Sequence, residues 1–188
     1  MTEQKRVFVA VNISEEARRA VAGYVDKLRL KFPDTRCRWV PPENLHITAW
    51  FIGNIDAAAL EKWKEWVSLA ADALASFKVE LKSTGRFSQY RQHSHVLWLG
   101  ANSEPADRFV QIVHYLHEDK RVKPHLTIGR LKNSSGAGEL ISEHLSSEFG
   151  PLLFQVNELV IYESKLGPDG SIYTPIFKAP LRIAEDGD

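Results

Sequence analysis

Net charge and long apolar runs are both missing from this sequence of 188 residues. Its 24 Lys and Arg balance 24 Asp and Glu, which excludes a strongly basic coat for long nucleic acid but leaves room for a local basic cleft. No run approaches the roughly 20 apolar residues of a membrane span. The early apolar stretch VFVAV is too short for a signal-peptide core, and no small-residue cleavage site follows it. We therefore expect a cytoplasmic protein with no membrane partner.

Cysteine is almost absent as well. The single thiol, Cys37, excludes an internal disulfide, and the chain has no CxxC pair and no zinc-finger spacing. We interpret Cys37 as a small buried or half-buried residue, which is the usual situation of a free cysteine.

The residues that are present are typical of an ordinary globular domain. Hydrophobic residues make up 44% of the chain and charged residues 26%, a balance that excludes a disordered chain. Alternating apolar residues predict strands, and apolar residues at helical spacing predict helices. Ser14 and Asp56 are suited to cap the first two helices. The expected strands cover 6–12, 38–40, 45–53, 77–82, 95–100, 124–131, 154–162 and 172–181, and the expected helices cover 15–32, 57–74, 105–116 and 140–145.

The order of these elements contains a repeat. Each half of the chain reads strand, helix, histidine-bearing strand, helix, strand. The strands after each second helix begin with FKV at Phe77 and FQV at Phe154. These matches suggest an old duplication and predict two lobes packed as one unit, a single bilobal domain over residues 1–188.

The most informative pattern is His-x-Thr, which occurs once in each half. On a strand, residues two apart point to the same side, so His46 shares a face with Thr48, and His125 shares a face with Thr127. If a pseudo-twofold axis relates the lobes, the two faces meet in one cleft. That arrangement would bring two imidazoles and two hydroxyls around one point.

Such a site suits a phosphodiester. One neutral imidazole can take a proton from water, while one imidazolium gives a proton to the leaving oxygen. Both forms coexist near neutral pH because the ordinary histidine pKa is about 6.5. Threonine hydroxyls can bind the non-bridging oxygens, and Arg130 could add a bidentate contact. Strict alternation, however, places Arg130 on the face opposite His125.

The sequence also resembles a known family, the two-histidine phosphoesterases, and within it the LigT-like RNA 2′,3′-cyclic phosphodiesterases, once called 2′-5′ RNA ligases. The similarity covers nearly the whole chain. It is carried by RVFVAVNIS, LHITAWFIG, GRF followed by VLWLG, PHLTIGR and ESKLGPDGSIYTPI.

This resemblance implies a bilobal α+β fold, with two antiparallel sheets lining a cleft and helices outside. It implies hydrolysis of a ribose 2′,3′-cyclic phosphate to a 2′-phosphate, with His46 as the proton donor and His125 as the acceptor. The implied phosphate contacts are Thr48, Thr127 and Arg130. The family needs no metal and no cofactor, and some members join or split 2′-5′ linkages. The expected partners are RNA ends and cyclic nucleotides, and we expect a monomer.

Other residues could carry chemistry but are better explained by structure. His93 and His95 could share a strand face and are expected at a solvated loop edge. The pair His114 and His117 is expected on a helix surface, and His144 is expected to be structural. Five tryptophans are expected mostly in the core, whereas Phe87 or Tyr90 could stack a base. The tryptophans are Trp39, Trp50, Trp63, Trp66 and Trp98.

Two other functions remain open at the level of sequence. The chain could be a non-catalytic module that binds RNA ends or nucleotides. It could also be a metal-dependent hydrolase that uses its histidine pairs. A turnover assay tests the first alternative, and treatment with a chelator tests the second.

Overall fold

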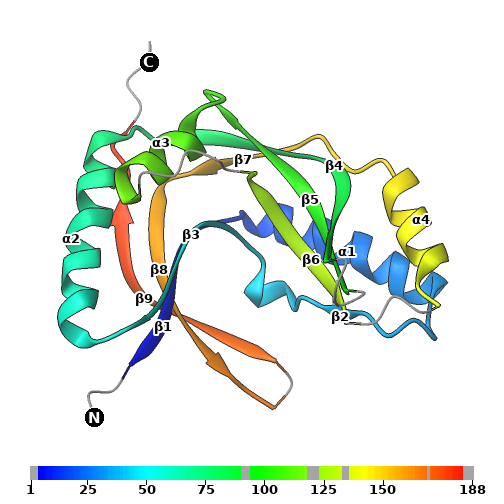
Figure 1. Ribbon diagram of the computed structural model, residues 1–188. Coiled ribbons are helices and arrows are strands. Elements are labelled where there is room, and N and C mark those ends of the chain that lie inside the picture. The colour runs from blue at the N-terminus through cyan, green and yellow to red at the C-terminus, as the bar shows by residue number, and fades with distance from the viewer. Residues whose placement is uncertain (1–3, 90–93, 118–122, 133–135, 169, 184–188) are drawn as a thin grey trace.

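The structure, a computed structural model, describes residues 4–89, 94–117, 123–132, 136–168 and 170–183 (Figure 1). In these ranges the chain forms helices and strands in an alternating order. The elements are β1 (Lys5–Asn12), α1 (Glu15–Lys31), β2 (Arg38–Trp39), the 3-10 helix η1 (Pro42–Asn44), β3 (His46–Ile55), α2 (Ala57–Ala73), β4 (Phe77–Gln89), β5 (Ser94–Glu104), α3 (Arg108–Leu116), β6 (His125–Leu131), α4 (Gly138–Ser146), β7 (Leu152–Val156), β8 (Glu158–Leu166) and β9 (Ser171–Pro180).

The strands form one curled antiparallel sheet in the order β7-β4-β5-β6-β3-β1-β8-β9, with β2 paired to β6. Its two halves meet where β3 pairs with β6, at Ile47 and Leu126. These are the two histidine-bearing strands, so the sheet curls at the point where His46 and His125 lie. The α+β class is confirmed, and the two expected sheets are the two halves of this continuous one.

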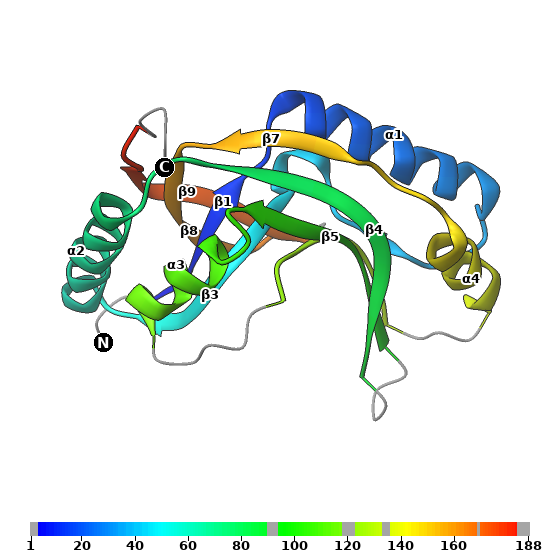
Figure 2. The ribbon, with the colours of Figure 1, turned by 90° about the horizontal axis from the view of Figure 1, so that it is seen from above.

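The helices cover the outside of the curl, and α1 lies over the half of the sheet that does not contain the strand before it (Figures 1 and 2). α2 packs against β8, β9 and α3, whereas α4 packs against β4 and α1 packs against β7. α1 therefore follows a strand of one half and covers the other half. A hydrogen bond of 2.8 Å between Tyr24 on α1 and His144 on α4 holds these two helices together.

The proposed repeat is wrong at one place. β4, which begins with FKV, and β7, which ends with FQV, pair directly with each other, and Val79 lies opposite Phe154. They are neighbours in one half, not equivalents in two halves. β3 and β6, by contrast, hold matching places, because each is the innermost strand of its half.

Local signals positioned most helices and strands correctly. The side chains of Ser14 and Asp56 accept hydrogen bonds from Ala17 N–H and Ala59 N–H, so both caps are confirmed. The Gly167–Gly170 turn joins β8 to β9 through hydrogen bonds between its two glycines. α3 buries four apolar residues at helical spacing, Phe109, Ile112, Val113 and Leu116. It begins at Arg108 and not at residue 105, because residues 105–107 form a turn before it.

Two strand predictions differ from the structure. β4 continues to Gln89 and β5 begins at Ser94, so the polar stretch after residue 82 forms the arms of a long hairpin. Pairing between the arms, such as Ser88 with His95, supplies hydrogen bonds that composition alone does not show. The expected strand 154–162 is interrupted at Asn157, where the chain passes from β7 in one half to β8 in the other.

Within the described ranges, no helix combines the length and the apolar composition needed to cross a membrane.

Candidate active site

The two histidines are anchored in the same way. The Nδ1 of His46 lies 2.7 Å from the carbonyl oxygen of Asn44, and the Nδ1 of His125 lies 2.7 Å from that of Lys123. A carbonyl only accepts hydrogen bonds, so Nδ1 carries the proton in each neutral ring. Both Nε2 atoms are therefore left as bases that can accept or return a proton.

Each histidine has its threonine beside it on the same strand. The Oγ1 of Thr48 lies 3.0 Å from the Nε2 of His46, so this hydroxyl donates to the neutral ring. When His46 is protonated the bond reverses, and the hydroxyl proton is released for another acceptor. Thr127 is half-buried on β6, on the same side as His125 by strand alternation.

Arg130 lies near both histidines, against the expectation from strict alternation. Leu97 pairs with Gly129 and Trp98 pairs with Thr127, so Ile128 is an extra residue, a β-bulge, on β6. Because the bulge shifts the alternation by one residue, Arg130 returns to the face of His125. Its positive charge acts on the pKa of both imidazoles. β3 carries a matching bulge at Ala49, directly after Thr48.

Burial and charge hold both imidazoles neutral at pH 7. Desolvation lowers the pKa of His46 to about 4, and the positive charges of Arg130 and His125 act in the same direction. Desolvation also lowers the pKa of His125, together with the charges of Arg130 and Lys123. The hydrogen bonds to the backbone carbonyls oppose these shifts only in part.

Aromatic rings surround His46. Phe8, buried on β1, has its ring centroid 4.9 Å from that of His46. Tyr173 meets the imidazole edge-on at 5.2 Å, and Tyr162 lies parallel to Phe8 at 5.5 Å. These three rings come from β1, β8 and β9. The sequence analysis missed them because only the pairing of β1 with β3 and β8 brings them together.

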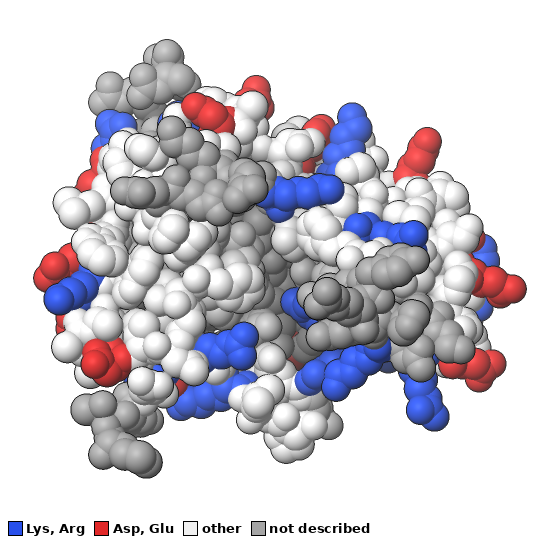
Figure 3. Space-filling model, viewed as in Figure 1, with Lys and Arg blue, Asp and Glu red and all other residues white. Residues whose placement is uncertain are grey.

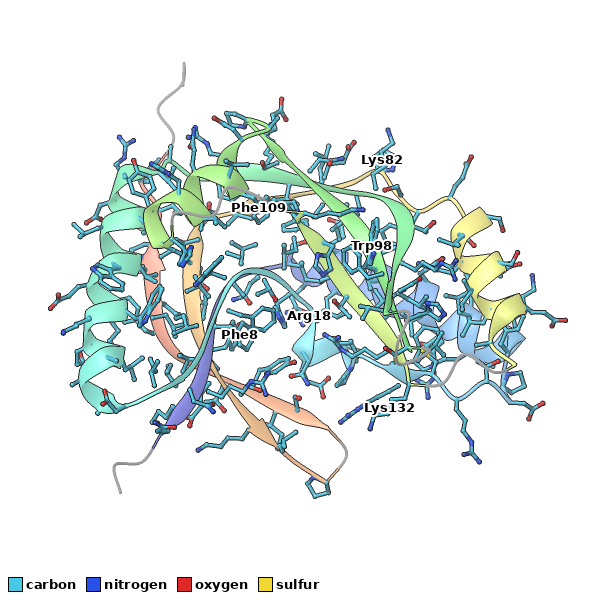
Figure 4. The ribbon with its side chains drawn as sticks, viewed as in Figure 1. Phe8, Arg18, Lys82, Trp98, Phe109 and Lys132 are labelled. Carbon is cyan, nitrogen blue, oxygen red and sulfur yellow. The ribbon has the colours of Figure 1, made fainter. Side chains whose placement is uncertain are left out.

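A second aromatic group lies beside His125. The ring of Phe87, a predicted base-stacking residue, is 4.8 Å from the imidazole, and the ring of Trp98 is 5.3 Å from Phe87. Trp98 lies flat against Gly85, where a Cβ would overlap its ring. The ammonium of Lys123 lies 4.6 Å from the Trp98 ring centroid. Figure 4 shows Phe8 and Trp98 in the two halves of the curl, on either side of the junction.

Several predicted residues lie away from this site. His114 and His117 are exposed as expected, and His117 stacks on Trp50 at 4.3 Å. His95 bonds to Ser88, while His93 and the second candidate stacking residue, Tyr90, lie outside the described residues.

The other structural predictions are largely confirmed. His144 is fully buried, as expected of a structural residue, whereas its neighbour Leu145 is 42% exposed. Cys37 is half-buried, and desolvation raises the pKa of its thiol to about 12. Of the tryptophans, Trp39, Trp50, Trp63 and Trp98 are buried or pack against the core, whereas Trp66 is 47% exposed.

The described residues contain no cluster of three or more His, Cys, Asp or Glu that could hold a metal ion. The groups that the structure brings around the two histidines are hydroxyls, cations and aromatic rings. This donor set suits an anionic, partly aromatic ligand.

Comparison with known proteins gives one consistent result. A family model described as the 2′-5′ RNA ligase superfamily matches residues 16–168. A curated protein of Methanocaldococcus jannaschii named RNA 2′,3′-cyclic phosphodiesterase is 31% identical over 91% of this chain and 98% of its own length. One of the same name from Thermotoga maritima is 28% identical over 92% of this chain and 94% of its own length.

Solved structures give the same fold. A crystal structure of a Thermus thermophilus protein superposes with a TM-score of 0.74 at 26% identity, covering 96% of this chain and 100% of that one. Escherichia coli LigT in its apo form gives a TM-score of 0.74 at 21% identity, over 96% of this chain and 99% of that one. The LigT-like fold expected from the sequence is thus confirmed, and the chain belongs to the 2′-5′ RNA ligase superfamily.

Proposed function

We infer that this protein is an enzyme that hydrolyses the terminal 2′,3′-cyclic phosphodiester of RNA to a 2′-phosphomonoester. The observation that carries the inference is the pair of histidines at the junction of the sheet, each anchored through Nδ1 and each two residues before a threonine. Relatives that match over about nine-tenths of the chain carry the name of this activity.

In the proposed reaction His125 acts as the base. Its Nε2 takes a proton from a water molecule while the water oxygen forms a bond to phosphorus. The bond between phosphorus and the ribose 3′ oxygen breaks, and the Nε2–H of His46 gives its proton to that oxygen. One proton is taken and one is given, so the step leaves His125 protonated and His46 neutral. His125 then loses a proton to solvent and His46 takes one up, which restores the pair for the next turnover.

Thr48, Thr127 and Arg130 bind the non-bridging oxygens in this proposal. Once His46 is protonated its Nε2 no longer accepts from the Thr48 hydroxyl, so that hydroxyl can turn its own proton toward the phosphate while Nε2–H faces the leaving oxygen. Arg130 adds a charged contact that grows stronger as negative charge develops on these oxygens. The bulge at Ile128 supports this role, because it places Arg130 on the histidine face.

The low pKa of His46 requires that the substrate take part in its protonation. With a pKa of about 4, His46 is neutral in the free protein at pH 7. A bound anion favours the imidazolium form and raises the pKa of a neighbouring histidine. The phosphate therefore brings the donor into its active state, and the free enzyme does not hold an unpaired charge in a desolvated site.

The same site supports two further parts of the proposal, the range of substrates and the joining of 2′-5′ linkages. Cyclic mononucleotides present the same phosphate and are proposed as substrates alongside RNA ends. Joining or splitting of a 2′-5′ linkage is the same phosphoryl transfer with a ribose hydroxyl in place of water. A single bilobal domain, a monomeric state and a cytoplasmic location stay predictions.

The decisive experiment is to identify the product formed from a nucleoside 2′,3′-cyclic phosphate. We expect the 2′-phosphate, formed at the same rate with and without excess EDTA. The 3′-phosphate would reverse the assignment of the leaving oxygen. Binding without turnover would favour a non-catalytic module, and a loss with EDTA that added divalent metal restores would favour a metal-dependent hydrolase.

A further inference from the structure

The carbonyl group that anchors His46 belongs to a short turn. η1 is a single 3-10 turn, and its last residue, Asn44, supplies the carbonyl oxygen that lies 2.7 Å from the Nδ1 of His46. The turn is closed by a hydrogen bond of 3.2 Å from the N–H of Leu45 to the carbonyl oxygen of Pro42. Hydrogen-bond geometry in a 3-10 turn is poor, and such turns occur in short pieces. The direction of the Asn44 carbonyl therefore depends strongly on the contacts that hold the turn from outside.

The side chain of Asn44 makes one of these contacts, with the β8–β9 hairpin. Its Nδ2 donates a hydrogen bond of 2.8 Å to the carbonyl oxygen of Ser171, the first residue of β9. Two residues further along β9, the ring of Tyr173 meets the imidazole of His46 edge-on at 5.2 Å. Asn44 thus connects two groups that border His46, the acceptor at its Nδ1 and the aromatic ring at its side.

The rest of the turn is held without the Asn44 side chain. Arg18 on α1 donates through Nη1 to the carbonyl oxygen of Pro42, and its Nε lies 3.1 Å from Glu15. Leu45, which follows Asn44, is buried in the apolar core. Loss of the Asn44 amide should therefore loosen the end of the turn and leave the strand after it in place.

Water competes for the hydrogen bonds at this end of the turn. The surface is hollowed between the two halves of the sheet, and the face in Figure 3 shows this central depression. His46 is half-buried at the junction of these halves. If its acceptor is not held in direction, water can take the place of that acceptor. The neutral ring then populates both tautomers, because its partner no longer fixes which nitrogen carries the proton.

We propose that Asn44 is a positioning residue for the proton donor: its side-chain amide, bound to Ser171, holds the carbonyl that orients His46. This rests on the proposed function, in which the Nε2–H of His46 gives its proton to the leaving oxygen. The ring that remains after this transfer is the neutral Nδ1–H tautomer, which is the form that the Asn44 carbonyl binds. A fixed carbonyl therefore stabilises the ring as its proton leaves and keeps Nε2 directed at the leaving oxygen.

The base has an anchor of the same kind but a separate attachment. The carbonyl of Lys123 binds the Nδ1 of His125, and the Lys123 ammonium lies 4.6 Å from the ring centroid of Trp98 and 5.3 Å from that of Phe87. These rings belong to β5 and β4, in the other half of the sheet. The bond between Asn44 and the hairpin therefore acts on the donor and not on the base.

Two variants and two substrates test this role. Asn44→Ala removes the amide with its bulk, and Asn44→Leu removes the amide but keeps the bulk. Asn54→Ala is the matched control, because Asn54 is exposed near the far end of the same strand, β3. The substrates are a nucleoside 2′,3′-cyclic phosphate and bis-(p-nitrophenyl) phosphate, whose nitrophenolate leaves without taking a proton. Circular dichroism checks the fold of each variant.

A measurement without substrate accompanies the kinetics. Nitrogen NMR of protein labelled in its histidine rings reports which ring nitrogen carries the proton, and the signal of His46 is identified by its absence in His46→Ala. At pH 7.5 this ring is neutral, since its pKa is about 4. Wild-type His46 should show only the Nδ1–H tautomer, and both Asn44 variants should show a mixture of the two tautomers.

We expect each Asn44 variant to lower kcat for the cyclic phosphate by about 5-fold, the scale of one hydrogen bond. Hydrolysis of bis-(p-nitrophenyl) phosphate should be unchanged, because that leaving group does not need the donor. Asn44→Ala added to His46→Ala should cause no further loss on the cyclic phosphate, since the residue acts through that ring. Asn54→Ala should match the wild type in every measurement.

Equal losses on the two substrates, or a further loss in the His46→Ala background, would mean that Asn44 supports the fold or the base, and would overturn the proposal. The same holds if both Asn44 variants fail to fold, or if both keep the wild-type tautomer. If the wild type hydrolyses only the cyclic phosphate, the double variant decides. If it hydrolyses neither substrate, the proposed function fails, and the nitrogen spectra alone decide whether Asn44 positions His46.

Discussion

In the proposed mechanism His46 and His125 act through their Nε2 atoms, and neither ring belongs to the buried apolar core. We predict that His46→Ala and His125→Ala each lower turnover of a cyclic phosphate by about 10²–10⁴, the scale of a positioned acid or base. The fold should survive, because each ring is only half-buried at the junction of the sheet. Circular dichroism checks the fold, and steady-state kinetics checks the loss.

The assignment of donor and acceptor has its own test. A substrate whose leaving group needs no proton should rescue His46→Ala more than His125→Ala, because only the donor becomes dispensable. Equal rescue, or better rescue of His125→Ala, would mean that the two roles are reversed. A folded single variant with near wild-type activity would remove that residue from the mechanism.

Anion binding should be coupled to uptake of a proton. The pKa of His46 is about 4 in the free protein, and a bound anion raises it. Between these two pKa values, binding must draw a proton from the buffer. Sulfate is a suitable probe because it does not titrate in this range. We predict proton uptake on sulfate binding at pH 6, seen by calorimetry as a binding enthalpy that depends on the ionisation enthalpy of the buffer.

His46→Gln should remove most of that uptake while keeping a polar side chain in place. The dependence of kcat/KM and kcat on pH should show the same low pKa values as the proton uptake. The pKa values of both histidines lie below 6.5 in the free protein, so kcat/KM should be bell-shaped with its maximum below pH 6.5. The kcat profile should lie at higher pH, because it reports the complex. Sulfate binding without proton uptake would contradict this account of the donor.

At the scale of elements, α4 depends on one buried histidine. His144 is fully buried, its Nδ1 accepts from the Tyr24 hydroxyl at 2.8 Å, and its Nε2–H donates to the Gly85 carbonyl at 3.0 Å. Both hydrogen bonds suit the neutral ring, and desolvation lowers its pKa. In the unfolded chain the ring titrates near 6.5. Its contribution to stability is therefore complete above pH 6.5 and is lost as the pH falls below that value.

We predict that His144→Gln lowers the free energy of unfolding at pH 7.5 by about 1–3 kcal/mol, because one buried partner is left unsatisfied. The variant should lose less further stability than the wild type between pH 7.5 and 5, since glutamine does not titrate. His114→Gln, a change of the same kind on an exposed face of α3, is the control and should alter neither quantity. Urea unfolding at several pH values measures both. A parallel loss of stability in wild type and His144→Gln on acidification would contradict this role.

Sequence patterns predicted most helices and strands correctly, and they failed mainly for features that depend on which strands pair with each other. The caps at Ser14 and Asp56 depend on contacts within three residues, so local composition is enough to find them. Arg130 was misplaced because a bulge depends on the partner strand, which the sequence does not show. The prediction that each histidine shares a face with its threonine was correct, because the bulge in each strand lies after the threonine. The rings around His46 were missed for the same reason as the bulge, because β1 and β3 lie far along the chain from the β8–β9 hairpin and only strand pairing brings them together.

At the scale of the whole molecule, the two halves of the sheet are built from interleaved chain segments. β4 follows the first histidine strand but lies in the half of the second, while β8 and β9 return to the half of the first. One cluster of buried apolar residues contains members from both halves, among them Leu99 and Ile161. The strands β4 to β7 come from one continuous stretch, 77–156, but β2, which pairs with β6, and α1, which packs on β7, come from the N-terminal part of the chain. The other half is complete only when β8 and β9, which follow that stretch, join β1 and β3.

This interleaving predicts that the protein unfolds in one transition. Leu99 on β5 and Ile161 on β8 are both fully buried, in different halves, and Leu99→Ala and Ile161→Ala should each lower stability by about 2–5 kcal/mol. If the halves cannot fold separately, each variant should shift the same single heat-absorption peak, with the calorimetric and van't Hoff enthalpies equal. Two peaks, with each substitution moving only one of them, would mean that the halves are independent domains. The histidines would then meet at an interface between domains. A single peak places them at a junction that forms only when the whole sheet does, so that a functional site exists only in the fully folded chain.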